Sequence, residues 1–194
     1  IRASEKRFYQ KVRDLFTLSS DYDATDKATQ MFFAETQNKL LYAVTEKTAA
    51  EIIVSRADAN APNMALTNWK GKIVRKQDIY IAKNYLTEDE LDSLNRLVVI
   101  FIETAELQAK GRKDITMKFW QENVDGIITF NKKALLSGKG NVSNVHMEEF
   151  VEKIYDEFNT RRKQHELQQA DEQDMQELNM LEENIKTRRS INKK

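Results

Sequence analysis

The chain of 194 residues contains no cysteine, one proline and five glycines. The absence of cysteine excludes disulfides, thiol catalysis, and zinc or iron–sulfur sites built on thiolates. Because helix-breaking residues are scarce and 32% of the side chains are charged, the composition favours long, solvated helices over strands and turns. Only two histidines are present, so a histidine-rich metal centre is not expected.

Long apolar runs and an excess of one charge are also missing. The longest apolar run, Leu97–Ile102, is far shorter than the ~20 residues that cross a bilayer, and no basic-then-apolar leader opens the chain. The 31 basic and 31 acidic side chains cancel. We therefore expect a cytoplasmic protein with no membrane partner and, because the first residue is Ile1, a domain cut from a longer chain.

Hydrophobic periodicity predicts an all-α, compact fold of about six or seven helices. Capping boxes at Thr48–Glu51 and Thr87–Glu90 mark two helix starts. The helix after Thr87 is apolar around nearly its whole circumference, which predicts a central, buried position. The expected helices span, approximately, residues 3–18, 25–44, 48–57, 87–109 and 116–136, with a last helix from residue 143 onward.

The segment between residues 64 and 86 has an ambiguous pattern. Ile79 and Ile81 alternate with polar neighbours, as in a strand, whereas Ile81, Tyr85 and Leu86 fit one face of a helix. A strand here has no evident partner, so a helix is the preferred interpretation.

The composition changes after residue 161. No aromatic residue occurs from residue 159 onward, and the 3–4 spacing of Leu178, Leu181 and Ile185 meets two aspartates when extended backward. Aspartates in such a seam argue against a strong coiled coil. We predict a compact helical domain over residues 1–162 and a charged helical arm over 163–194, paired in a homo-oligomer and frayed at its end.

A basic segment with interleaved aromatic residues lies between residues 69 and 83. Cations neutralise phosphates and aromatic faces stack on bases, so the segment fits a nucleic-acid-binding surface. The alternative is a charged surface that forms such a cluster by chance. The candidate nucleic-acid-binding residues are Trp69, Lys70, Lys72, Arg75, Lys76 and Lys83.

Polar side chains are also dense between residues 42 and 70. The candidate polar site consists of Tyr42, Thr48, Glu51, Arg56 and Asp58. Three interpretations remain open: an active site, a ligand or partner pocket, and a structural polar network. The last is favoured, because the capping box explains Glu51 and a local ion pair would explain Arg56 with Asp58.

Two other motifs predict no ligand site. Asp21, Asp23 and Asp26 lack the glycine and glutamate that a calcium-binding EF-hand loop requires. The Ser137–Asn141 segment lacks the glycine spacing and the preceding strand of a phosphate loop, so we interpret it as an interhelical turn. No metal or cofactor is expected.

Strings along most of the chain match, in order, the virulence-associated RhuM family, which the sequence resembles up to about Phe158. Glu46 and Ala65 depart from the family pattern, in which glycine is expected at both places, so a local role that needs glycine is in doubt here. The matching strings include Arg2–Asp14, Ser19–Asp23, Gln37–Lys39, Tyr42–Glu51, Arg56–Asp58, Asn63–Gly71, Ala82–Leu86 and Leu94–Arg96.

The resemblance implies a bacterial protein of mobile elements or pathogenicity islands. Family members carry an upstream DNA-binding-like domain, expected to precede Ile1, and relatives are fused to Fic-type toxin domains. The Fic signature is not present in this sequence. No catalytic residues transfer from the family, and a Fic-type toxin system is one candidate partner.

The leading hypothesis is a non-enzymatic interaction and oligomerisation domain of a DNA-associated protein, with contact to nucleic acid through the basic segment. One alternative is a toxin-like enzyme acting on nucleic acid or nucleotide, with a polar centre of Glu51, Arg56, Asp58 and Lys70. Another is a partner-binding module, which would expose an apolar groove instead of a basic face.

Overall fold

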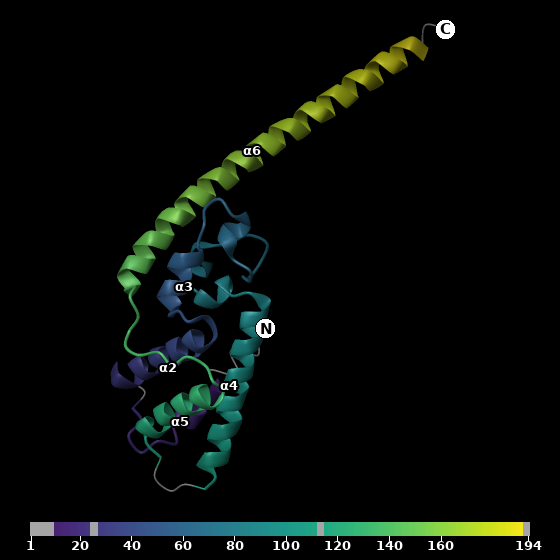
Figure 1. Ribbon diagram of the computed structural model, residues 1–194. Helices are drawn as coiled ribbons and strands as arrows, with labels where there is room; N and C mark the ends of the chain where they lie inside the picture. The colour runs from purple at the N-terminus through teal and green to yellow at the C-terminus, as the bar shows by residue number, and fades with distance from the viewer. Residues whose placement is uncertain (1–9, 24–26, 112–114, 192–194) are drawn as a thin grey trace.

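The computed structural model describes residues 10–23, 27–111 and 115–191, with the backbone alone for residues 28–30 and 182–191. Helices and short 3-10 turns make up the regular structure of these residues, which confirms the all-α fold (Figure 1). Residues 10–16 are helical; the rest of the helix expected over 3–18 lies largely outside the described residues. The α-helices that follow are α2 (Lys27–Thr45), α3 (Ala49–Arg56), α4 (Glu88–Ala109), α5 (Met117–Phe130) and α6 (Asn144–Ile191).

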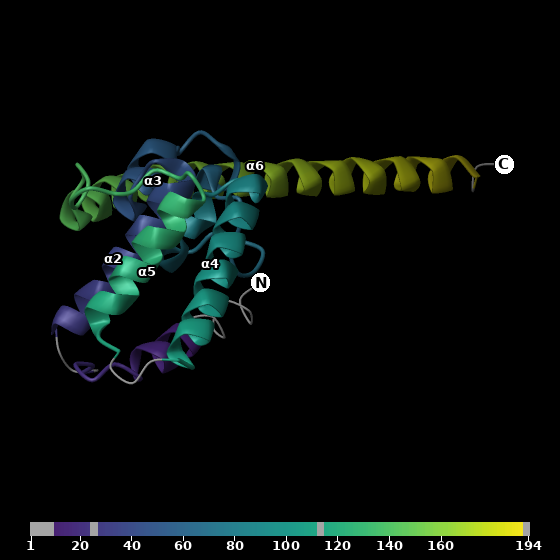
Figure 2. The same ribbon diagram turned by 60° about the horizontal axis from the view of Figure 1, so that its bottom comes forward.

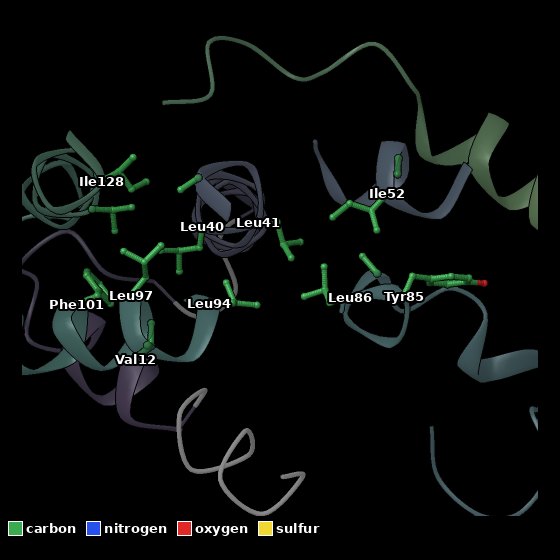
Figure 3. Close-up of a cluster of buried hydrophobic side chains, with 14 of the residues drawn as sticks. Val12, Leu40, Leu41, Ile52, Tyr85, Leu86, Leu94, Leu97, Phe101 and Ile128 are labelled. Carbon is green, nitrogen blue, oxygen red and sulfur yellow. The ribbon is translucent and has the colours of Figure 1, made fainter. Parts of the chain in front are cut away.

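The core lies where α2, α4 and α5 pack against one another. Leu40 of α2 points toward Leu97 of α4, whereas Leu41 points to the other side of α2, toward Leu86, as the close-up in Figure 3 shows. The fully buried Trp120 of α5 donates its indole N–H to the Ser19 hydroxyl at 2.8 Å, which connects this core to the residues after the first helix. The same core continues around Ile52 of α3, where α3 packs against α6 and against η3, in the chain before α4.

Helix α4 begins as its capping box predicts. The Thr87 hydroxyl accepts from the Glu90 amide, and the Glu90 carboxylate accepts from the Thr87 amide. The expectation that α4 is buried all round is wrong, because Val99 and Ile100 are 55% and 39% exposed. Among the described residues, α2 and α5 pack on one side of α4, and part of its apolar surface faces solvent (Figure 2).

The chain between α3 and α4 is not the α-helix that we preferred. It forms three 3-10 turns, η1 (Pro62–Ala65), η2 (Lys76–Asp78) and η3 (Ala82–Tyr85), joined by irregular chain. Three consecutive residues, 63–65, have φ values of 53°, 60° and 60°, and no right-handed helix passes through such a backbone. Buried Asp78 and Asn84 hold the connection together, since the Asp78 carboxylate accepts from the Arg75 amide and the Asp78 carbonyl accepts from the Asn84 amide group.

Helix α5 ends at Phe130, six residues before the expected Leu136. Lys132 follows with a φ of 54°, and an extended segment leads to α6. Helix α6 has 48 residues and passes without a break through the expected domain boundary at residue 162. Its first turns lie along α3, and its remainder extends away from the other helices (Figures 1 and 2). None of the described helices has the length and apolar character needed to cross a membrane.

Candidate functional site

The basic segment lies on the irregular chain between α3 and α4. Lys70, Lys72, Arg75 and Lys76 are exposed, whereas Lys83 is half-buried. Lys70, Lys72 and Arg75 form no ion pair with any residue that the structure describes. These three cations are therefore available to an anionic ligand.

The aromatic side chains of the segment are less accessible to a ligand than its cations. Trp69 is half-buried against the core, and its buried indole N–H has no hydrogen-bond partner among the described residues. Tyr80 donates its hydroxyl to Glu152 of α6, and the same carboxylate lies 3.2 Å from Lys76 Nζ. Burial and this carboxylate raise the pKa of Tyr80 to about 12, while Tyr80 and then Lys76 lower the pKa of Glu152.

The structure divides the candidate polar site into separate contacts. Tyr42 and Glu51 line an open pocket of about 670 Å³ between the α2–α3 corner and the chain that precedes α6. The Glu51 carboxylate completes the predicted capping box, in which its Oε2 accepts from the Thr48 amide at 2.8 Å. Its Oε1 accepts from the Asn141 amide at 2.7 Å. The Thr48 backbone hydrogen bond is the main cause that lowers the pKa of Glu51.

Arg56 makes a different contact, at the other end of α3. Its two terminal nitrogens donate to the two Glu90 oxygens at 2.6 Å each, and Nη1 also donates to the Tyr85 carbonyl at 2.7 Å. The guanidinium lowers the pKa of Glu90. The suggested pairing with Asp58 is wrong, because Asp58 accepts from the Asn60 amide at 2.8 Å. Glu51, Arg56 and Asp58 thus have separate partners.

The pocket beside Glu51 contains residues that the sequence analysis did not select. Lys47 and Lys139 line it, and Lys47 Nζ donates to the Ser55 hydroxyl at 3.0 Å. Gly140 has a φ of +79°, and a Cβ there would lie 2.6 Å from Thr48 Cγ2, so the loop packs tightly on the α3 cap. The Ser137–Asn141 turn was the only sequence signal for this contact. Among the described residues, no cluster of acidic and histidine side chains fits a metal ion.

The part of α6 beyond residue 162 is exposed on every side as far as its side chains are described, to residue 181. Apolar side chains are among the exposed ones: Leu167 is 66%, Leu178 58% and Leu181 59% exposed. These leucines are exposed at intervals along an otherwise highly charged helix.

Comparison with known proteins adds one finding. No curated protein and no solved structure is similar enough to this chain to match it. The model of the family described as "Virulence protein RhuM family" matches residues 1–166, which include the basic segment, the Glu51 pocket and the base of α6. The strings from Arg2–Asp14 onward therefore reflect common descent, and the chain belongs to the RhuM family of virulence proteins.

Proposed function

We propose that this chain is a non-enzymatic interaction and oligomerisation domain of a cytoplasmic, DNA-associated RhuM protein encoded on a mobile element or pathogenicity island. Residues 1–162 would form its folded body, and residues 163–194 the arm through which copies assemble. The observation that carries the proposal is the exposed continuation of α6 beyond residue 162.

A free helix of this kind gains little from its own backbone. Isolated helices are marginal in water, and most helical stability in proteins comes from tertiary packing of an apolar face. Burying a leucine side chain contributes about 1.5–3 kcal/mol, so a partner that covers Leu167, Leu178 and Leu181 would stabilise the arm substantially. A second copy of the chain presents the same three leucines and is therefore the partner that we propose.

The mass of the protein in solution tests this proposal. We expect sedimentation equilibrium to give an oligomer for the wild-type chain and a monomer for Leu178→Glu. Gln176→Glu is the matched control, because it adds the same charge to the exposed arm at a position on the opposite side of the helix. A wild-type chain that remains a monomer at all concentrations would remove the oligomerisation half of the proposal.

The basic segment supports the second half, contact with nucleic acid. Lys70, Lys72 and Arg75 are exposed and lack carboxylate partners among the described residues. Binding through phosphate contacts weakens as salt rises, because counterions are released. Lys70→Glu/Lys72→Glu should abolish salt-sensitive binding to labelled duplex and single-stranded DNA, whereas the equally charged control Lys132→Glu/Lys133→Glu should retain it. Shortened DNA in the same reactions would instead support the toxin-like enzyme.

One observation favours a partner-binding module as a second candidate function. An open groove of about 450 Å³ lies between α4 and α5 and is lined by Ile100, Phe119 and Phe130, of which Phe130 is 86% exposed. The family's association with Fic-type toxin domains makes such a toxin the partner to test. If the chain binds no DNA, co-purification with a Fic-type toxin that is lost in Phe130→Ser would support this function.

A further inference from the structure

The three leucines of the arm, Leu167, Leu178 and Leu181, lie on the side of α6 away from the folded body, whereas Met180 does not. Val151 and Phe158 pack α6 against the core. At 3.6 residues per turn, Leu178 lies about 200° around the helix axis from Phe158, and Leu167 and Leu181 lie on the same side as Leu178. A helix that covers these leucines therefore approaches α6 from outside, without contact with the body of its own chain.

The charges of the arm follow a block pattern. Between residues 164 and 185 the sequence has no lysine or arginine, but it has the acidic residues Glu166, Asp171, Glu172, Asp174, Glu177, Glu182 and Glu183. Immediately afterwards, within the same helix, come Lys186, Arg188 and Arg189. A basic end thus follows an acidic middle.

This pattern disfavours parallel pairing of two arms. In a parallel pair in register, each acidic residue lies near its own copy, and like charges at such positions are destabilising. In an antiparallel pair, the basic end of one arm can lie opposite Asp171 and Glu172, where the acidic stretch of the other arm begins. The exposed leucines also permit this arrangement. A two-fold axis between Leu178 and Leu181 lets Leu178 of each arm pack against Leu181 of the other.

We propose that two copies of this chain pair through antiparallel arms, with Leu178 of one copy packed against Leu181 of the other. This inference rests on the proposed oligomerisation. It adds that the partner is one second copy, that the two arms run in opposite directions, and which residues face each other. The register sets helix position 188 opposite Asp171. A two-fold interface of this kind is self-complementary, so each favourable charge contact occurs twice.

The arrangement places the two folded bodies at opposite ends of the paired arms. At about 1.5 Å per residue, the two copies of residue 162 lie about 50 Å apart. The two basic segments are then separate surfaces, one at each end of an elongated dimer. A parallel pair would instead hold the two bodies side by side.

The absence of cysteine from the chain permits a direct test by disulfide cross-linking of the full protein. Asp171→Cys and Arg188→Cys, which this register sets opposite each other in the interface, are purified separately and then oxidised alone and after mixing. We expect a cross-linked dimer only in the mixture. Gln169→Cys replaces Asp171→Cys in the matched control, because it lies within one turn of Asp171 on the opposite side of the helix, and it should give no cross-link.

The other outcomes separate this inference from the proposed oligomerisation. Cross-links within each variant alone would show parallel arms, which would overturn the antiparallel inference and leave oligomerisation intact. A dimeric mass without any cross-link would place the interface elsewhere and would also overturn the inference. A monomeric mass for the wild-type chain would overturn both.

A charge exchange provides a second measurement that does not depend on cysteines. Asp171→Arg and Arg188→Asp should each weaken the dimer at low salt, and the double variant should recover most of the lost affinity. If each single variant lowers the dimer affinity and the double variant does not restore it, the proposed register is contradicted.

Discussion

The Glu51 side chain joins the start of α3 to the backbone of Asn141, 90 residues further along the chain. One carboxylate oxygen accepts from the Thr48 amide at 2.8 Å and the other accepts from the Asn141 amide at 2.7 Å. One side chain thus caps a helix and fixes the loop that leads to α6.

Replacing this carboxylate should destabilise the domain. We expect Glu51→Ala to lower the free energy of unfolding by about 1–3 kcal/mol, because the Thr48 and Asn141 amides both lose their acceptor. Urea unfolding followed by circular dichroism measures the change. Glu103→Ala, at an exposed position on α4, is the control and should change the stability by less than about 0.5 kcal/mol.

The same contact predicts a dependence on pH. The pKa of Glu51 is lowered in the folded state, so the stabilisation from the ionised carboxylate is present above the unfolded value and is lost as pH falls through the folded one. The stability difference between wild type and Glu51→Gln should therefore be largest near neutral pH and shrink below the ordinary pKa of 4.5. A constant difference down to strongly acidic pH would contradict this assignment.

The Arg56–Glu90 pair predicts that lysine does not replace arginine. Both side chains are less than a quarter exposed, and the guanidinium makes two parallel hydrogen bonds to Glu90 and a third to the Tyr85 carbonyl. Lysine keeps the charge but not this planar fork. Arg56→Lys should lower the free energy of unfolding by about 1–2 kcal/mol, since charge-assisted hydrogen bonds are lost. At Arg96, whose ion pair with Asp92 is exposed, the same substitution should have almost no effect.

Glycine should be accepted at the two positions where the family pattern led us to expect it. Glu46 and Ala65 have φ values of 56° and 60°, in the left-handed region that costs a residue with a Cβ about 1–2 kcal/mol. Glu46→Gly and Ala65→Gly should raise the free energy of unfolding by up to about 1 kcal/mol, because relief of strain exceeds the added entropy of the unfolded chain. Ala34→Gly, within α2, should lower it by about 1 kcal/mol. An equal decrease in the free energy of unfolding in all three variants would refute the argument that Glu46 and Ala65 are strained.

The Lys76–Glu152 contact predicts a gain in DNA binding. Glu152 lies 3.2 Å from Lys76 Nζ and offsets the charge of the basic segment. If that segment contacts phosphates, Glu152→Gln should raise affinity at low salt and steepen the logarithmic dependence of affinity on salt by up to about one unit. Fluorescence anisotropy with labelled duplex DNA measures both. Glu149→Gln removes an equal charge from an exposed position of α6 and should leave binding unchanged.

Local patterns determined the helices and where several of them begin. Thr48 and Glu51, or Thr87 and Glu90, are three residues apart, so the capping contacts are contained within a few residues of sequence. The apolar spacing around Trp120 likewise specifies the buried face of α5, although not the end of that helix. These features required no knowledge of the rest of the chain.

Tertiary structure decided how the polar residues are used. Arg56 meets Glu90 across 34 residues, and Glu51 meets Asn141 across 90, and no local pattern specifies such partners. The left-handed turn at residues 63–65 could not be predicted from the sequence for a similar reason. Only the surrounding packing makes residues with a Cβ adopt that backbone. Sequence periodicity gives the face of a helix, whereas the fold decides which face is covered, as exposed Val99 and Leu178 show.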